Sequence, residues 1–361
     1  MTNLIVLFSS TIFVILFLFI LFIFFTIIAS IITKKENYPA FEPSVSIVIP
    51  AYNEEKCIRD CMDSIKSMEY PKNKIEVIVV DDGSSDKTLN VVEEYSAIIL
   101  GQEHLGKVEA LNNGVMHASN DFIFTVDADT IIDRRCLKEL IRPFSNEKIG
   151  ATNGAIKTKE SKNSFLRTFQ DVEYSYNNLI RHSFSKIFKN GIWFFGAIAC
   201  YRRSSLKKIG YFKRDTITED MDIAMEMKKN GYKTLNVKNA FGYTDVPETL
   251  KEIYRQRSRW WIGGLQTLIK NNAMFSAKYG VSSLFLFINQ VFWSFYALIS
   301  IPIIAYQFNY WLPYNSNSII ELSVYTFRWF SFYGPVWVLY KIPANGLSYC
   351  PIVPSTSGCP A

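Results

Sequence analysis

The sequence has few of the residues that build structural metal sites. It contains 6 cysteines and 3 histidines in 361 residues, and no two cysteines form a C-x-x-C pair. Because zinc sites are built from closely spaced cysteines and histidines, this scarcity argues against structural zinc. The length of the chain also excludes a small disulfide-stapled scaffold.

Charge is also scarce. Charged residues make up 20% of the chain, and 39 Lys and Arg against 33 Asp and Glu give a net charge of +6. No run of basic residues is interleaved with aromatic ones, as it is on nucleic-acid-binding surfaces, so we expect no nucleic-acid partner. Hydrophobic residues make up 49%, with 28 Phe and 20 Tyr. This composition indicates that part of the chain lies in a lipid bilayer.

Residues 1–33 predict an N-terminal transmembrane helix. Residues 4–32 carry no charge and exceed the roughly 20 residues that a helix needs to span a bilayer. A cleaved signal peptide is the alternative, but the run has no basic segment before it and no small-residue cleavage site before Lys34. Lys34 and Lys35 follow the helix, so the positive-inside rule places the next domain in the cytoplasm. We therefore expect a multi-pass protein of the plasma membrane.

Residues 34–272 predict one cytoplasmic α/β domain. Short Val- and Ile-rich runs alternate with helical segments, which is typical of a parallel, doubly wound sheet. The regularity weakens after residue 150. The segments with the clearest patterns are strands in SVSIVIP and at about 75–80, 97–100 and 122–126, and helices at about 54–68, 84–95, 107–117, 165–188 and 249–270.

Residues 279–340 predict a C-terminal membrane region. Residues 281–312 contain no charge and are long enough to cross a bilayer again. A second candidate span, residues 322–340, contains Pro335 and Arg328, and we interpret Arg328 as an anchor at the membrane surface. Residues 341–361 have no periodicity and predict an irregular tail.

Acidic residues follow two of the predicted strands. The strand at 75–80 leads into VDDGSSD, which contains Asp82, and the strand at 122–126 leads into Asp127 and Asp129. In a doubly wound sheet, ligands bind beyond the carboxyl ends of the strands. Carboxylates two residues apart repel each other unless a cation lies between them, and hard oxygen ligands suit Mg²⁺ or Mn²⁺. The pattern favours a metal and phosphate site over a solvated acidic turn.

Glu219 and Asp220 precede another predicted helix. They could simply favour the positive end of the helix dipole, with Thr218 as the N-cap. Alternatively, an acid held beside phosphate charge could act as a general base and deprotonate a hydroxyl. The residues alone leave both interpretations open.

The predicted helix at 249–270 carries Gln256, Arg259 and Trp260. Gln256 and Arg259 are three residues apart and share a helix face. A guanidinium and an amide could stabilise a departing diphosphate, and the Trp ring could support a sugar ring. A belt of Arg and Trp at the membrane interface is the other interpretation, and the two are compatible.

Six motifs together resemble the membrane-bound, processive branch of glycosyltransferase family 2, which includes synthases of poly-N-acetylglucosamine, chitin, hyaluronan and cellulose. The motifs are PAYNE, VDDGSSD, GKVEALNNG, DAD, TED and QRSRW, in this order within about residues 44–270. The resemblance implies a glycosyltransferase-A fold, which is a Rossmann-like α/β domain with a mostly parallel sheet, here flanked by transmembrane helices. It also implies a nucleotide-sugar donor, a divalent metal (Mg²⁺ or Mn²⁺) and inversion at the anomeric carbon.

The resemblance further implies roles for residues that bind the nucleotide. Tyr52 and Glu54 of PAYNE and Asp82 of VDDGSSD correspond to family positions that hold the uridine. Lys107 corresponds to a position near the nucleotide.

Other positions match the reaction centre of the family. Asp127 and Asp129 match the D-x-D pair that binds nucleotide and metal, and Asp220, next to Glu219, matches the general base. Residues 256–260 match the Q-x-x-R-W motif, which secures the diphosphate and lines the acceptor site.

The implied function is that of a membrane-embedded inverting glycosyltransferase. It would transfer a sugar from UDP-N-acetylglucosamine, or another UDP-hexose, to a growing polysaccharide. Asp220 would act as the base, and a metal held by the DAD motif together with Arg259 would stabilise the departing UDP. The segment ITEDMDIAMEM resembles the N-acetylglucosamine-polymer branch more than the cellulose branch.

Two alternatives remain open. Relatives that export a polymer usually have more helices after Q-x-x-R-W, so a second copy or a partner chain would have to complete an export channel. A non-processive enzyme that glycosylates a membrane lipid would not need such a channel. An inactive membrane scaffold of a polysaccharide export complex is the second alternative, but no acid of DAD or TED is missing.

Overall fold

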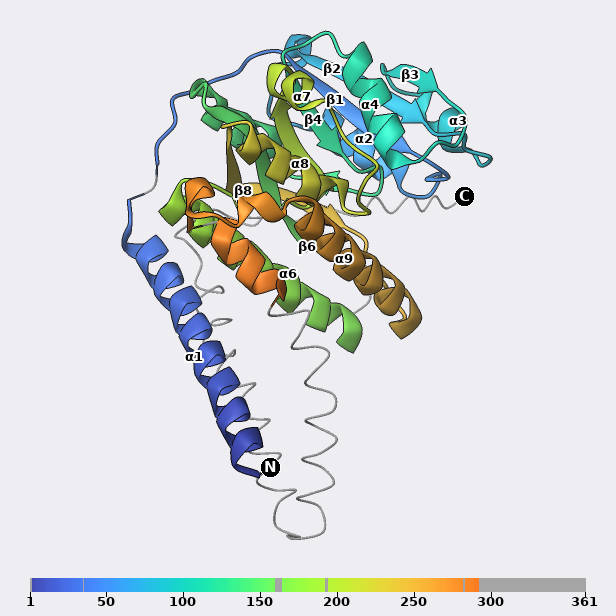
Figure 1. Ribbon diagram of the computed structural model, residues 1–361. Helices are drawn as coiled ribbons and strands as arrows, with labels where there is room; N and C mark the ends of the chain where they lie inside the picture. Colours follow the sequence, from blue (N-terminus) through green and yellow to red (C-terminus); the bar gives the residue numbers. More distant parts are fainter. Residues whose placement is uncertain (1, 35, 160–163, 192–193, 282, 292–361) are drawn as a thin grey trace, which may run out of the picture. The chain divides into compact units, whose positions relative to one another are not determined.

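The computed structural model describes residues 2–34, 36–159, 164–191, 194–281 and 283–291 (Figure 1). They belong to one unit, Met1–Phe295. In the predicted span 281–312, residues 281 and 283–291 are helical and the rest lies outside the described residues. The predicted second span and the tail lie outside them altogether and stay predictions.

A mixed sheet of eight strands, in the order β3-β2-β1-β4-β7-β6-β8-β5, forms the centre of this unit. β7 is antiparallel to both of its neighbours and β5 is antiparallel to β8, whereas the other pairs are parallel. The strands are β1 (Val45–Ala51), β2 (Ile75–Asp81), β3 (Ile98–Gly101), β4 (Phe122–Val126), β5 (Ile131–Ile132), β6 (Ile149–Thr158), β7 (Ile198–Arg202) and β8 (Lys233–Thr244).

Helices pack on both faces of the sheet (Figure 1). The α-helices are α1 (Thr2–Ile32), α2 (Ile58–Lys66), α3 (Thr88–Val92), α4 (Lys107–His117), α5 (Cys136–Ile141), α6 (Phe165–Phe188), α7 (Arg203–Ile209), α8 (Glu219–Lys229) and α9 (Leu250–Lys270). Short 3₁₀ helices occur at Lys72–Lys74, Arg142–Ser145, Asn272–Met274 and Ala277–Tyr279.

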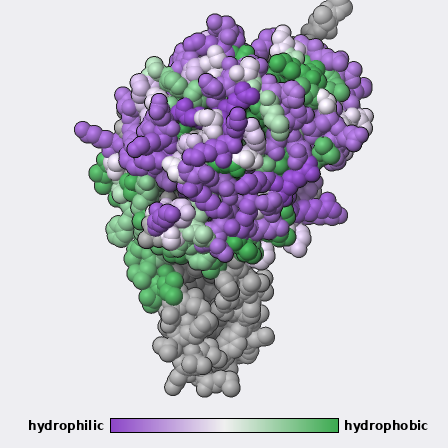
Figure 2. All heavy atoms as spheres, turned by 45° about the horizontal axis from the view of Figure 1, so that its top comes forward, coloured by the Kyte–Doolittle hydropathy of each residue, from purple (hydrophilic) through white to green (hydrophobic). Residues whose placement is uncertain are grey.

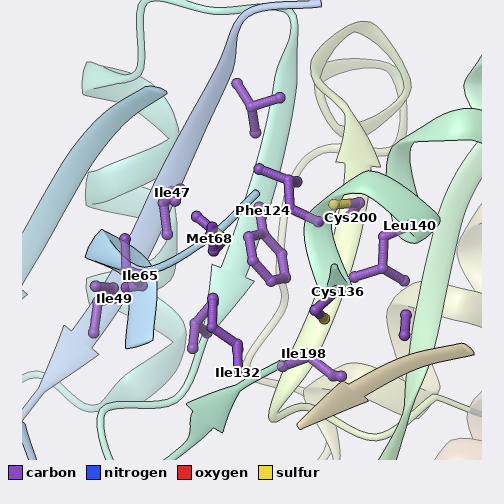
Figure 3. Close-up of a cluster of buried hydrophobic side chains, with 14 of the residues drawn as sticks. Ile47, Ile49, Ile65, Met68, Phe124, Ile132, Cys136, Leu140, Ile198 and Cys200 are labelled. Carbon is purple, nitrogen blue, oxygen red and sulfur yellow. The ribbon is translucent and has the colours of Figure 1, made fainter. Parts of the chain in front are cut away.

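The core has one apolar layer on each face. On one face, residues such as Ile49 and Phe124 pack against Ile65 of α2 and Leu140 of α5 (Figure 3). On the other face, β1 and β2 pack against α4, where a Cβ on Gly114 would lie 2.4 Å from Val48 Cγ1. Only a glycine therefore allows α4 to approach the sheet so closely, and α4 begins at the site described below.

α1 coincides with the predicted N-terminal helix, and its last turns contact α6. Ile23 and Phe184 share a buried cluster, and Ser30 Oγ donates a hydrogen bond of 2.9 Å to Ser183 Oγ. Hydrophobic residues gather at the lower left of Figure 2, the side on which Figure 1 shows α1. The side chains of residues 1–13 and 16 are not described. Within the described residues, no helix is both long and apolar enough to cross a membrane.

The predicted α/β class is confirmed, with two antiparallel strands in an otherwise parallel sheet. The helix at 107–117 and the strand at 122–126 have their predicted bounds. The helix predicted at 84–95 was too long, because only Thr88–Val92 is helical. β6 and β8 were not predicted, since their Gly, Asn, Thr and Lys residues interrupt the apolar pattern. β7 was not predicted either, because it is only five residues long and follows the aromatic segment at 194–195.

Candidate active site

A cavity of about 520 Å³ lies beside the carboxyl end of β4. Its wall is built from the end of β4, the start of α4, the start of α8 and one face of α9. Eight of the eleven predicted site residues line it: Lys107, Asp127, Asp129, Glu219, Asp220, Gln256, Arg259 and Trp260. The fold thus brings together segments that are up to 153 positions apart in the sequence.

Lys107 is the first residue of α4 and reaches two acids of the cavity. Gly106 precedes it with a φ of +94°, a conformation that favours glycine. Lys107 Nζ lies 2.7 Å from Asp127 Oδ1 and 3.2 Å from Glu219 Oε1. Burial alone would lower the pKa of Lys107, but the charges of Asp127 and Glu219 outweigh it and raise that pKa well above its usual range. Lys107 therefore stays charged.

Three charged groups surround Gly196, in the loop before β7. A Cβ on Gly196 would lie 3.2 Å from Lys107 Nζ, 3.3 Å from Asp220 Oδ2 and 3.5 Å from Glu219 Oε1. The missing side chain therefore leaves room for the ammonium group and the two carboxylates to converge.

Asp220 has the properties of a base that works near neutral pH. It is half-buried at the start of α8, and its Oδ1 accepts a 2.7 Å hydrogen bond from the Met221 amide. Loss of water and the negative charge of Glu219 raise the pKa of Asp220, while Lys107 and the Met221 amide oppose them, and the result is about 7. A carboxylate with such a pKa can accept and hold a proton.

Thr218 occupies the N-cap position of α8, as predicted, but its side chain does not cap the helix. Its hydroxyl lies 3.2 Å from the hydroxyl of Thr267 on α9 instead. A Cβ on Gly263 of α9 would lie 2.6 Å from Thr218 Cγ2. Thr218 therefore connects the start of α8 closely to α9, and α9 carries the Q-x-x-R-W residues.

Asp127 and Asp129 offer oxygen ligands at the end of β4. Asp129 accepts hydrogen bonds from the Thr130 hydroxyl at 3.1 Å and the Thr244 hydroxyl at 3.4 Å. Burial and the charge of Asp127 raise the pKa of Asp129. No group of three or more His, Cys, Asp or Glu in the described part of the chain could hold a metal ion. Two carboxylates beside an open cavity nevertheless suit a cation that keeps waters and binds phosphate oxygens, as Mg²⁺ does.

Asp82 does not line the cavity but holds the loop that precedes Lys107. Its side chain is 4% exposed and accepts hydrogen bonds from Leu105 N at 2.9 Å, Gly106 N at 2.8 Å and Gln102 Nε2 at 2.7 Å. Burial would raise the pKa of Asp82, but these donors together lower it. The predicted contact of Asp82 with uridine stays a prediction.

Tyr52 and Glu54 also lie outside the cavity wall. Tyr52 is 44% exposed, and its ring stacks on His104 with 3.9 Å between the centroids. Burial and the charges of Asp129 and Asp127 raise the pKa of Glu54 to about 7. The negative charges of the two cavity acids therefore act on the Glu54 carboxyl group. His104 was not among the predicted site residues, because its partner Tyr52 is distant in the sequence.

An aromatic wall was also missed. Tyr174 of α6 and Phe195 line the cavity with Trp260, and the Tyr174 centroid lies 6.5 Å from that of Trp260 and 6.4 Å from that of Phe195. The FFG sequence before β7 was the available signal for Phe195. Tyr174 had none, because α6 contains many aromatic residues. Arg214 and Asp245 line the cavity as well and were not predicted.

Residues 46–210 match the model of the family described as Glycosyl transferase family 2. The match identifies residues 46–210, which are less than half of the chain, as a glycosyltransferase family 2 domain. Proteins with similar sequences are also named as enzymes that synthesise a polysaccharide. The chain is 31% identical over 250 residues to a poly-beta-1,6-N-acetyl-D-glucosamine synthase of Staphylococcus epidermidis. It is also 31% identical over 235 residues to the protein of the same name from Staphylococcus aureus.

The chain spans only part of these relatives. The matches cover 67% and 63% of this chain, but 59% and 56% of the two synthases. Among solved structures, the chain resembles a mannosyltransferase of Pyrobaculum calidifontis in complex with GDP-Man and Mn²⁺. The TM-score is 0.59 at 19% identity, and the alignment covers 85% of this chain and 92% of the mannosyltransferase. This likeness supports the fold.

Proposed function

We propose that the chain is an inverting glycosyltransferase that adds N-acetylglucosamine from UDP-N-acetylglucosamine to a polysaccharide. The observation that carries the proposal is the convergence of Lys107 Nζ, Asp220 Oδ2 and Glu219 Oε1 around Gly196, in a cavity that Asp127 and Asp129 also line. Such a cavity combines positive charge for a diphosphate with a carboxylate that can take a proton.

Asp220 is the proposed general base. It removes the proton from an acceptor hydroxyl, and the hydroxyl oxygen forms a bond with the anomeric carbon of the donor. The bond between that carbon and the diphosphate oxygen breaks on the opposite face, and UDP leaves with the electron pair. One displacement of this kind inverts the anomeric configuration. The raised pKa of Asp220 supports the role, because the carboxylate can keep the proton that it takes.

The leaving diphosphate needs positive charge rather than a general acid. Lys107 and Arg259 both line the cavity and can place that charge beside the UDP oxygens. Asp127 and Asp129 are the residues that would hold a divalent cation. Such an ion, when bound, stabilises negative charge on the diphosphate. Gln256 lines the same wall and can donate a hydrogen bond from its amide.

The relatives support the choice of substrates. Both staphylococcal proteins are named synthases of poly-β-1,6-N-acetyl-D-glucosamine, which requires an activated N-acetylglucosamine and a growing chain. The aromatic wall of Trp260, Tyr174 and Phe195 offers flat apolar surfaces, on which a sugar ring can stack.

We also propose that residues 4–32 anchor the chain in the plasma membrane, with the family 2 domain in the cytoplasm. The 29 uncharged residues of this segment and the exposure of Phe17, Leu18 and Phe25 on α1 support the proposal. Alkaline carbonate extraction of membranes tests it. The full chain should stay with the membrane pellet, and a chain that appears in the supernatant would contradict the anchor.

The test of the enzymatic function uses membranes that contain the full chain. A panel of UDP- and GDP-sugars is assayed for nucleotide release with Mg²⁺ or Mn²⁺ and with EDTA. We expect release from UDP-N-acetylglucosamine that EDTA abolishes. Asp220→Asn should lose at least about a hundredfold in rate, the size typical of a lost acid–base group. Asp60→Asn, which changes an exposed acid on α2, is the matched control and should be unaffected.

The labelled product decides between the acceptors. A ladder of soluble or wall-associated sugar polymers supports polysaccharide synthesis, whereas one organic-extractable spot would show a lipid acceptor. Nucleotide release that is equal in Asp220→Asn and wild type would contradict the proposed role of Asp220.

A further inference from the structure

Two aromatic residues of the cavity wall each have an arginine stacked behind them. The guanidinium carbon of Arg257 lies 4.1 Å from the ring centroid of Trp260, and that of Arg181 lies 3.9 Å from the ring centroid of Phe195. Arg257 and Trp260 are three residues apart on α9 and therefore share a helix face. A cation held over a ring attracts it and restricts its tilt.

Arg257 is in turn held by α6. Its Nη2 donates to Glu173 Oε2 at 2.5 Å, and the next residue of α6 is Tyr174, whose ring lies 6.5 Å from that of Trp260. The contacts thus form a closed ring with two residues from each helix. We call Glu173, Tyr174, Arg257 and Trp260 the α6–α9 clasp.

The ion pair of the clasp is poorly hydrated. The side chains of Arg257 and Glu173 are 25% and 30% exposed, and burial raises the pKa of Glu173 although Arg257 opposes it. Nη1 of Arg257 is buried and has no hydrogen-bond partner among the described residues. The ion pair and the Trp260 ring, rather than a complete set of hydrogen bonds, therefore determine where the guanidinium lies.

We propose that Glu173 and Arg257 are positioning residues for the acceptor and that they act through Trp260. The inference rests on the proposed function and specifies its acceptor site. Glu173 fixes Arg257, Arg257 fixes the plane of Trp260, and that plane stacks on the terminal hexose ring of the acceptor. The stacked ring presents its hydroxyl to Asp220.

Glu173 and Arg257 are separate from the residues that we propose bind the donor. Glu173 and Arg257 make no hydrogen bond or ion pair to Asp127, Asp129 or Lys107 in the described residues. Loss of the clasp should therefore impair transfer to the acceptor while the donor still binds and is hydrolysed by water. The ratio of sugar transferred to UDP released measures this difference, and a general loss of folding would not change it.

The experiment uses membranes with the full chain and UDP-N-acetylglucosamine labelled in the sugar. Total UDP release and label in the product are measured for wild type, Glu173→Gln and Arg257→Met. We expect the ratio of transfer to release to fall about tenfold in both variants, because misplacement by about 1 Å can cost up to about a hundredfold. Total release should change much less than this ratio, because neither residue forms an ion pair with the groups proposed to bind the donor.

Two further variants sharpen the test. Arg257→Lys keeps the charge opposite Glu173 but loses the planar guanidinium, so its ratio should lie between wild type and Arg257→Met. Arg255→Ala removes an exposed arginine from the same helix and should match wild type. An unchanged ratio in Glu173→Gln and Arg257→Met would overturn the inference, as would a parallel loss of transfer and release.

Amide hydrogen exchange tests the clasp independently of enzymatic activity, so it can fail or succeed whether or not the proposed function is correct. Glu173→Gln and Arg257→Met should speed amide exchange in residues 250–270, and Arg255→Ala should not. Equal exchange in all variants would refute the clasp, whatever the activity. A wild-type chain that releases no UDP would refute the proposed function, and the acceptor role with it, while exchange would still report on the clasp.

Discussion

Replacing Glu219 with glutamine should move the acid limb of the pH–rate profile toward lower pH. The negative charge of Glu219 stabilises the protonated form of Asp220 and so raises its pKa. The substitution removes that charge and keeps the size of the side chain. It also frees Lys107 from its 3.2 Å contact with Glu219, and Lys107 lowers the pKa of Asp220. Both effects have the same sign.

The size of the effect follows from the geometry around Gly196. Asp220 Oδ2 and Glu219 Oε1 lie 3.3 Å and 3.5 Å from one point, the position of a Cβ on that residue. The two oxygens are therefore at most about 7 Å apart. At an effective dielectric constant of about 20, charges at that distance interact with about 2.4 kcal/mol, which corresponds to a pKa difference of about 1.7. Water reaches this group of charges, since the neighbouring Lys107 side chain is 38% exposed, and it weakens their interaction. We therefore expect the pKa of Asp220 to fall by about 1 in Glu219→Gln.

The assay is the pH dependence of kcat/KM for nucleotide release from UDP-N-acetylglucosamine, which reports the free enzyme. Wild type should lose activity as the pH falls through about 7, because Asp220 becomes protonated. Glu219→Gln should keep its activity down to a lower pH, and Glu93→Gln, at an exposed position, should match wild type. A limb that moves toward higher pH would refute the electrostatic reasoning. Loss of activity in Glu219→Gln at every pH, with activity kept in Asp220→Asn, would show that Glu219 is the base.

Two other substitutions test the site and the stability of the fold. Gly196→Ala should lower the rate of nucleotide release at least about tenfold, since its Cβ would lie 3.2 Å from Lys107 Nζ and displace the converging charges. Gly101→Ala is the control and should release nucleotide at the wild-type rate, because no atom lies within 4 Å of its added Cβ. Lys228→Met should raise the thermal unfolding temperature near pH 7. Burial lowers the pKa of Lys228 to about 7, so the folded state gives up a proton that the unfolded state keeps, and wild-type stability should rise with pH above 7. Circular dichroism at several pH values checks this, and a wild type no less stable at pH 7 than Lys228→Met would contradict it.

Much of the parallel half of the fold could be predicted because it is encoded locally. β1 and β2 are rich in Val and Ile, and four of the five residues of β4 are apolar. Polar residues separate these strands from the helices that follow, so the pattern can be recognised without knowledge of the neighbouring strands. β6 and β8 pair with each other over most of their length and read as mixed polar sequence. Their strand conformation comes from that pairing, which no local pattern reveals.

The amino-acid sequence by itself determined most of the residues that we assign to the site, because the acids that end β4 and start α8, and the Gln, Arg and Trp of α9, form short motifs that can be recognised along the chain. The tertiary structure alone decided how these groups act on one another. Lys107 pairs with Asp127, Gly196 makes room for three charges, and Asp82 holds a loop instead of lining the cavity. Glu173 and Arg257 are 84 residues apart, and only the packing of α6 on α9 brings them together. Interactions between side chains depend on distance in space, which residue spacing along a chain does not fix.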